Sequence, residues 1–275
     1  MKKTLAAVIL PFLVLSFIGC NSGTGNKKAA AQKLKSTEAE QEKKIEKEIT
    51  KNVYPLPTSA QVIKMLTDLE VGYIIGISNP PENSKKYYTS AARSINLGVY
   101  GADLSYATLY NYQQEVTNYM DVIRGIANDL NMSKIYNAPL YDSIKKNFDK
   151  RDRLVQILTN AFNDTYAYMS ENDQQTLALL VVGGAWVEGM YLTTHVSEAA
   201  YQVAGISKVL LEQKKSFDLY LDLTKPYIED PMIKDFVNNL EPIKKVYAGL
   251  GTSLTMDNIK DITTAISTIR EKIIL

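Results

Sequence analysis

A carboxylate stands in the middle of an apolar stretch of the chain. In LALLVVGGAWVEGMYLTTH, the residues Glu188, Tyr191 and His195 follow one another at spacings of three and four. Residues at these spacings share one face of a helix. An acid inside so apolar a helix is costly unless it is paired with another group or hydrated. Glu188 is therefore the first candidate for a functional group.

A second unusual helix candidate spans residues 89–113, TSAARSINLGVYGADLSYATLYNYQ. Polar and aromatic residues recur there at helical spacing, in the stripe Arg93, Asn96, Tyr100, Asp103, Ala107, Tyr110 and Gln114. This stripe either faces water or lines a site. A small-residue stripe, Ala91, Gly98, Ala102 and Ser105, would let a neighbouring helix approach closely. Gly98 and Gly101 each cost roughly 1 kcal/mol in a helix interior, and close packing would explain them.

These two stretches suggest one candidate binding site. The second stretch also carries small residues, Gly183, Gly184 and Ala185. We expect the two helices to pack through their glycine-rich faces and to turn six side chains toward a common polar pocket. The candidate ligand-binding residues are Arg93, Tyr100, Asp103, Glu188, Tyr191 and His195. Ionisable groups within apolar surroundings mark functional sites in some proteins but not in all. The alternatives to a pocket are therefore a structural network, with Arg93 neutralising an acid, or solvated helix faces.

The inventory of reactive side chains argues against most enzyme classes. His195 is the only histidine and Cys20 the only cysteine, which excludes a multi-histidine zinc site. With Cys20 assigned to a lipid anchor, as argued below, no cysteine nucleophile remains. A serine triad would have to use His195, and no nucleophile-elbow pattern accompanies it. Phosphate-binding and calcium-binding loops are also missing from the sequence. We therefore assign no catalytic residue, metal or cofactor, and a non-enzymatic function is favoured.

One enzymatic alternative stays open. Asp103 and Glu188 could serve as acid and base in a glycan-directed hydrolase if they faced each other at the required separation. The sequence does not fix that distance.

The N-terminus has the pattern of an export signal. Lys2 and Lys3 precede an apolar run, residues 5–18, that is too short to span a membrane. The run ends in Phe17-Ile18-Gly19-Cys20, which resembles a bacterial lipobox, with Phe17 where leucine is usual. The resemblance implies a signal peptide over 1–19 and a lipoprotein attached through Cys20, with palmitate as an expected acyl group. More than one acyl chain is needed for stable anchoring.

A charged tether follows, so the predicted organisation is a signal peptide over 1–19, a lipidated and charged tether over 20–52, and one helical domain over 53–275. The tether is rich in Ala, Lys, Glu and Gln and has few large apolar residues. Such charge runs are usually solvated, so we interpret it as a spacer. Residues 21–28 contain no acid. In the lipoproteins that the segment resembles, this favours a cell-envelope location at the outer membrane, facing the periplasm.

The folded part is expected to be all-α. Its long periodic stretches fit a period of 3.6, and no alternating β-branched run exceeds a few positions. Helices are predicted to begin at capping boxes, Thr58 with Gln61 and Asn172 with Gln175, and at Asp230-Pro231. We expect a bend near Tyr112, a kink or a split at Pro242, and a core-facing last helix over 258–274. No fixed-period repeat is found, so a multi-helix bundle is favoured over an α-solenoid-like array.

The stretches NLGVYGADLSYATLY and VVGGAWVEGMYLTTH, together with the lipobox, resemble those of a family of uncharacterised all-helical lipoproteins of Bacteroidota. The resemblance covers most of the chain after the tether. It implies an envelope with two membranes and an all-helical fold. It implies no activity and no catalytic residue.

The expected function is that of a membrane-anchored envelope protein. The formal net charge of +1 gives no argument for binding to nucleic acid. The 18 tyrosines against 6 phenylalanines favour surfaces where rings meet water at one edge. We expect a helical module that binds a small molecule, a glycan, a peptide or an envelope protein partner. The alternative is the hydrolase described above.

Overall fold

The computed structural model describes residues 72–198 and 206–275, and these belong to one compact unit. The signal peptide, Cys20, the tether and the predicted Thr58–Gln61 capping box lie outside the described residues. Within the described ranges every regular element is a helix, which confirms the predicted all-α bundle. The elements are η1 (Pro81–Lys86), α3 (Ser90–Leu109), α4 (Gln113–Asp129), α5 (Ala138–Lys145), α6 (Arg151–Glu171), α7 (Gln175–Glu198), α8 (Ile206–Thr224), η2 (Lys225–Tyr227), α9 (Pro231–Asn239), α10 (Glu241–Ala248) and α11 (Met256–Ile274).

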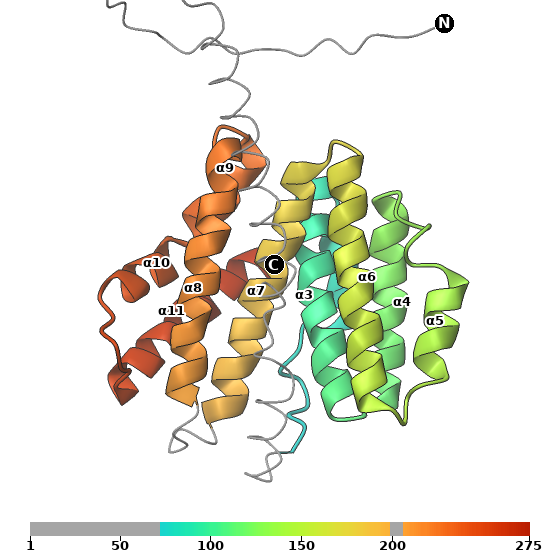
Figure 1. The fold of residues 1–275 in the computed structure, drawn as a ribbon, viewed down its shortest axis with the longest axis horizontal. Coiled ribbons are helices and arrows are strands. Elements are labelled where there is room, and N and C mark those ends of the chain that lie inside the picture. The colour runs from blue at the N-terminus through green and yellow to red at the C-terminus, as the bar shows by residue number, and fades with distance from the viewer. Residues whose placement is uncertain (1–71, 199–205) are drawn as a thin grey trace, which may run out of the picture. The chain divides into compact units, whose positions relative to one another are not determined.

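Helix α7 lies at the centre of the bundle (Figure 1). Helices α3 to α6 stand on one side of it and α8 to α11 on the other. Each side has its own cluster of buried apolar side chains, and α7 contributes to both, with Ala178 and Val181 in one and Leu180 and Trp186 in the other. A helix that is apolar around its whole circumference is expected in such a position.

Helix α7 is also long and apolar enough, by length and composition, to cross a membrane over Gln175–His195. Of its most apolar window, 83% is buried inside the fold. Its hydrophobicity is therefore explained by its central place in the bundle.

Helices α3 and α7 pack through glycines, as the sequence predicted. A Cβ atom added to Gly98 would collide with the carbonyl oxygen of Val181, and one added to Gly184 with the carbonyl oxygen of Ile95. Gly183 departs from the prediction because its Cα faces Phe236 and Tyr220, on the opposite side of α7. The close backbone approach of α3 and α7 brings side chains of the two helices together in the interior.

Several predicted helix ends are confirmed. The Asp230 carboxylate accepts hydrogen bonds from the backbone amides of Met232 and Ile233 at the start of α9. Pro242 stands in the first turn of α10, directly after α9 ends. The bend expected near Tyr112 is a break between α3 and α4, where Asn111 has a φ of 56°.

Two predicted helix starts are wrong. Asn172 caps the C-terminus of α6, and its side chain donates to the carbonyl of Tyr168 instead of opening α7. The Gln175 side chain donates to the hydroxyl of Tyr166. Helix α11 begins at Met256 instead of residue 258, because Thr255 and Asn258 form a reciprocal capping box.

Candidate functional site

The centre of the candidate site is an ion pair between α7 and α11. Both carboxylate oxygens of Glu188 accept hydrogen bonds from Arg270, from Nε at 2.6 Å and from Nη2 at 2.8 Å. Glu188 is fully buried and the Arg270 side chain is 9% exposed. A bidentate, charge-assisted pair is the arrangement that best offsets the cost of burying two charges.

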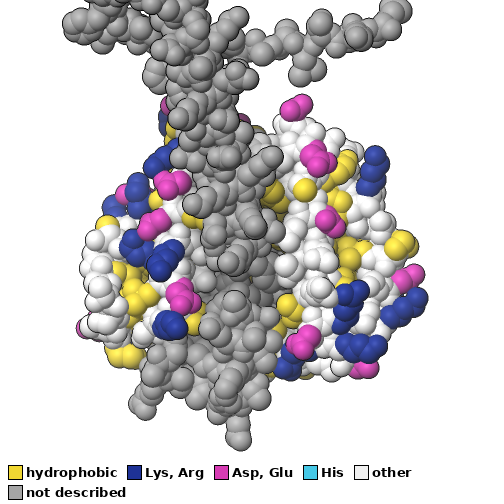
Figure 2. Space-filling view, in the orientation of Figure 1, with side chains coloured by type: hydrophobic (Ala, Val, Ile, Leu, Met, Phe, Trp, Pro, Cys, Tyr) yellow, Lys and Arg dark blue, Asp and Glu magenta, His cyan; other side chains and the backbone are white. Residues whose placement is uncertain are grey.

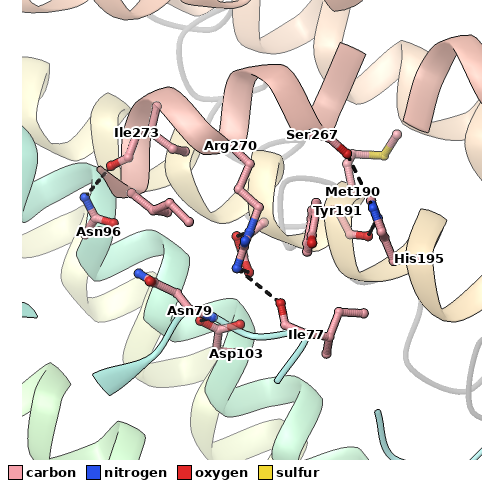
Figure 3. Close-up of polar contacts among 12 residues, drawn as sticks. Ile77, Asn79, Asn96, Asp103, Met190, Tyr191, His195, Ser267, Arg270 and Ile273 are labelled. Carbon is pink, nitrogen blue, oxygen red and sulfur yellow. Dashed lines mark hydrogen bonds and ion pairs between the residues drawn. The ribbon is translucent and has the colours of Figure 1, made fainter. Parts of the chain in front are cut away.

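Two of the predicted residues extend this ion pair along α7. The guanidinium of Arg270 lies 3.9 Å from the ring centroid of Tyr191, a cation–π contact. The rings of Tyr191 and His195 lie 3.9 Å apart, and Nε2 of His195 lies 3.4 Å from the Ser267 hydroxyl (Figure 3). Nδ1 of His195 lies 2.9 Å from the Tyr191 carbonyl oxygen, which only accepts, so we assign the proton to Nδ1.

Asp103 brings a second carboxyl group from α3 to the same place. It is fully buried, and its Oδ2 accepts a hydrogen bond from the Asn79 backbone amide at 3.2 Å. Burial, followed by the neighbouring Glu188 carboxyl, raises the pKa of Asp103 well above its ordinary value of 3.8, although Arg270 opposes this. Oδ1 of Asp103 has no hydrogen-bond donor among the described residues, which also favours the protonated form of this carboxyl group.

The raised pKa favours a protonated Asp103 beside the ion pair that Glu188 forms with Arg270. Burial alone would lower the pKa of Arg270, but Glu188 and then Asp103 raise it, so Arg270 stays charged. Among the described residues, no group of three or more His, Cys, Asp or Glu side chains could hold a metal ion.

The remaining two predicted residues lie apart from the ion pair. Tyr100 is buried, and its hydroxyl donates to the Pro80 carbonyl at 2.9 Å. Arg93 neutralises neither buried acid, because its guanidinium pairs with Asp129 of α4 at 3.0 Å on a partly exposed face. The structure thus brings Asp103, Glu188, Tyr191 and His195 into one network and places Arg93 elsewhere. Whether any of the six binds a ligand stays a prediction.

The residues that complete the network were not predicted. Arg270 was not among the candidate residues predicted from the sequence. Arg270 lies four residues after Ile266 and three before Ile273, which places it on the buried isoleucine face of the last helix. An arginine on that face was the available signal. Ile77 and Asn79 carried no signal, since they contribute backbone atoms from a segment without periodicity.

The surface grooves lined by described residues include three with volumes of about 600, 530 and 360 Å³. The largest of these three runs between α6 and the segment before α5, the second between η1 and α4, and the third beside α8. None of these three grooves is lined by a candidate residue. Figure 2 shows positive and negative side chains interspersed over the visible face.

Comparison of the chain with protein-family models, with curated proteins and with solved structures finds no match. The resemblance to all-helical lipoproteins of Bacteroidota therefore stays an expectation.

Proposed function

We propose that this protein is a lipid-anchored protein of the bacterial cell envelope, attached through Cys20 at the periplasmic face of the outer membrane, whose helical domain binds a partner. The anchor rests on the sequence Phe17-Ile18-Gly19-Cys20 after a short apolar run. The binding role rests on an aromatic surface of the domain.

That surface is the observation that carries the proposal. The rings of Tyr73 and Tyr112 stack with centroids 4.5 Å apart, and Tyr73 also stacks on Tyr106 at 5.0 Å. Tyr112 is 42% exposed, and Ile75 beside Tyr73 is 79% exposed. Large apolar side chains that stay exposed next to stacked tyrosines are typical of contact surfaces.

The hydrolase alternative has less support. A general acid and a general base must reach the substrate, and Asp103 and Glu188 are both fully buried. Both oxygens of Glu188 are also engaged by Arg270. The raised pKa of Asp103, which such an enzyme would need, follows from burial in a closed interior.

The anchor is tested by a single substitution. Cys20→Ser removes the acylated thiol, so the full-length chain should lose incorporated palmitate and leave the membrane fraction of cells that express it. The readouts are labelling with a palmitate analogue and sedimentation of membranes. Unchanged labelling and sedimentation would contradict the anchor.

The binding surface is tested by site-specific crosslinking in the envelope. A photoreactive residue at Tyr112 should give a discrete crosslinked species in the native cell, and the same residue at Lys208 should give none. Lys208 is exposed on α8, on the other side of the bundle (Figure 1). No species at Tyr112, or the same species at both positions, would contradict the proposal.

A further inference from the structure

Side chains of the buried network form hydrogen bonds to the backbone of a non-helical segment at the start of the described chain. Residues 72–80, which we name the strap, enter the bundle without forming a helix. Four side chains of the bundle contact main-chain atoms of the strap. The contacts are Tyr106 with the Ile74 amide at 3.0 Å, Arg270 with the Ile77 carbonyl at 3.3 Å, Asp103 with the Asn79 amide at 3.2 Å and Tyr100 with the Pro80 carbonyl at 2.9 Å.

These four contacts come from elements far apart in the sequence. Tyr100, Asp103 and Tyr106 stand on α3, and Arg270 stands on α11. Figure 3 shows Asp103 and Arg270 on either side of Ile77 and Asn79. Because each of them is buried to at least nine-tenths, the strap is held by preorganised groups of the interior and not by surface side chains. The slot that holds the strap is therefore a built site for a non-helical polypeptide segment with a turn at Ile75 and Gly76.

Besides its backbone, two side chains of the strap, Ile77 and Asn79, are bound by residues of the bundle, and these contacts make the slot selective. Ile77 is buried against Ala102, Tyr106 and Leu192. Asn79 is fully buried, and its amide donates to the Tyr87 hydroxyl at 3.0 Å. Gly76, with a φ of 82°, provides a left-handed bend that other residues rarely adopt. The slot thus recognises a glycine, an apolar residue next to it and an asparagine two positions later.

We propose that the strap occupies the partner site in cis, and that the partner is a non-helical polypeptide segment with the same turn that replaces it. This inference rests on the proposed binding function and names the class of its partner. Tyr73 and Ile75 of the strap form part of the aromatic surface described above, and Tyr112 lies outside the strap. The partner therefore makes its first contact beside Tyr112, and its own segment then replaces Tyr73 and Ile75 together with the rest of the strap. A partner segment that displaces the strap takes over the hydrogen bonds from Arg270 and Tyr100 and those to Asp103 and Tyr106.

The test separates the strap from the bundle after folding. A specific protease site is inserted in the full-length chain between Lys85 and Lys86, which are exposed in η1, and the folded protein is cut there. The probe is a fluorescent peptide of residues 72–83, GYIIGISNPPEN. In the intact chain the strap is present at an effective concentration of the order of mM, so it excludes the peptide.

The expected result is that the peptide, in large excess, binds the cut protein and binds the intact protein at least tenfold more weakly. A peptide with serine for Ile77 and alanine for Asn79 should not bind. The double substitution Tyr100→Phe and Tyr106→Phe should weaken peptide binding to the cut protein by about tenfold, because two hydrogen bonds to the strap are lost.

The matched control is Tyr141→Phe. The Tyr141 hydroxyl donates to the Met120 carbonyl at 3.0 Å, a hydrogen bond of the same kind that does not touch the strap. It should leave peptide affinity unchanged. The inference is overturned by absent binding to the cut protein, by unfolding on cutting, or by an equal loss of affinity in the control.

The outcome is separable from that of the proposed function. If crosslinking at Tyr112 succeeds and the peptide fails to bind, the partner contacts the aromatic surface without replacing the strap. If the peptide binds and no crosslinked species forms, the slot exists and the proposed envelope partner does not.

Discussion

Asp103 and Glu188 differ in their surroundings. Glu188 pairs with Arg270 through both carboxylate oxygens, whereas burial and the neighbouring Glu188 raise the pKa of Asp103 and favour its protonated form. A neutral amide can replace a neutral carboxylic acid, because the amide nitrogen donates to Glu188 and the amide oxygen accepts from the Asn79 backbone. An amide at position 188 leaves Arg270 without its bidentate partner.

Asp103→Asn should therefore change the free energy of unfolding by less than about 1 kcal/mol below about pH 4, where Asp103 is protonated in the folded and in the unfolded protein. Glu188→Gln should cost about 2 to 3 kcal/mol, less than a fully unpaired buried charge, because Asp103 can then ionise beside Arg270. The double variant should cost more than the sum of the two single ones. Urea denaturation of the three variants measures these differences. Additive costs would contradict the coupling between Asp103 and Glu188.

The raised pKa of Asp103 also predicts that the free energy of unfolding depends on pH. Because the pKa of Asp103 is raised in the fold, the folded state binds more protons than the unfolded state above about pH 3.8. The contribution of Asp103 to the free energy of unfolding is then present at low pH and is lost as pH rises through the folded pKa. The difference between wild type and Asp103→Asn should fall with rising pH, by at most about 1.4 kcal/mol per pH unit. A difference that stays constant from pH 4 to pH 8 would rule out a proton held by Asp103.

The sequence predicted this pairing only in part. Two acids among small and aromatic residues had to be paired or hydrated, which indicated a network or a pocket. From the sequence, only Arg93 was expected to neutralise an acid, although the place of Arg270 on the buried isoleucine face was an available signal. Arg93 shares α3 with Asp103, but ten residues, or about 15 Å along a helix, separate them.

At the scale of the elements, the contact between α3 and α7 determines where the acids meet. Gly98 and Gly184 bring the two backbones together, and this proximity places Asp103 beside Glu188. The small-residue pattern predicted this contact because helices approach closely only where side chains are absent. The helix ends were predicted less well, since Asn172 can cap either the helix before it or the helix after it.

Two glycines of α3 offer a direct comparison. Gly98→Ala should destabilise the protein by about 3 kcal/mol or more, because the new methyl group meets the α7 backbone, which cannot rotate away. Gly101→Ala, where no described atom lies within 4 Å of the new Cβ atom, should stabilise it by up to about 1 kcal/mol. Thermal or urea unfolding measures both. Equal effects of the two substitutions would contradict the packing of α3 on α7.

At the scale of the whole molecule, the strap is the first described segment of the chain and leads into the bundle. Its position could not be predicted from the sequence, because the bundle recognises mainly its amide and carbonyl groups, which every residue carries. The spacing of apolar residues predicts helices, and turn residues predict the breaks between them. Neither pattern predicts a non-helical segment in a buried slot. If the chain is anchored through Cys20, the strap lies between the anchor and the bundle along the sequence.

The central claim, that the buried network holds the strap, is tested most directly by native-state hydrogen exchange of the full-length protein. The backbone amides of Ile74 and Asn79 lie outside every helix, yet both donate to side chains of α3. Both should be strongly protected, with Ile74 losing protection in Tyr106→Phe and Asn79 losing it in Asp103→Ala. Exchange of both amides at the rate of an unstructured peptide in the wild-type protein would contradict the account.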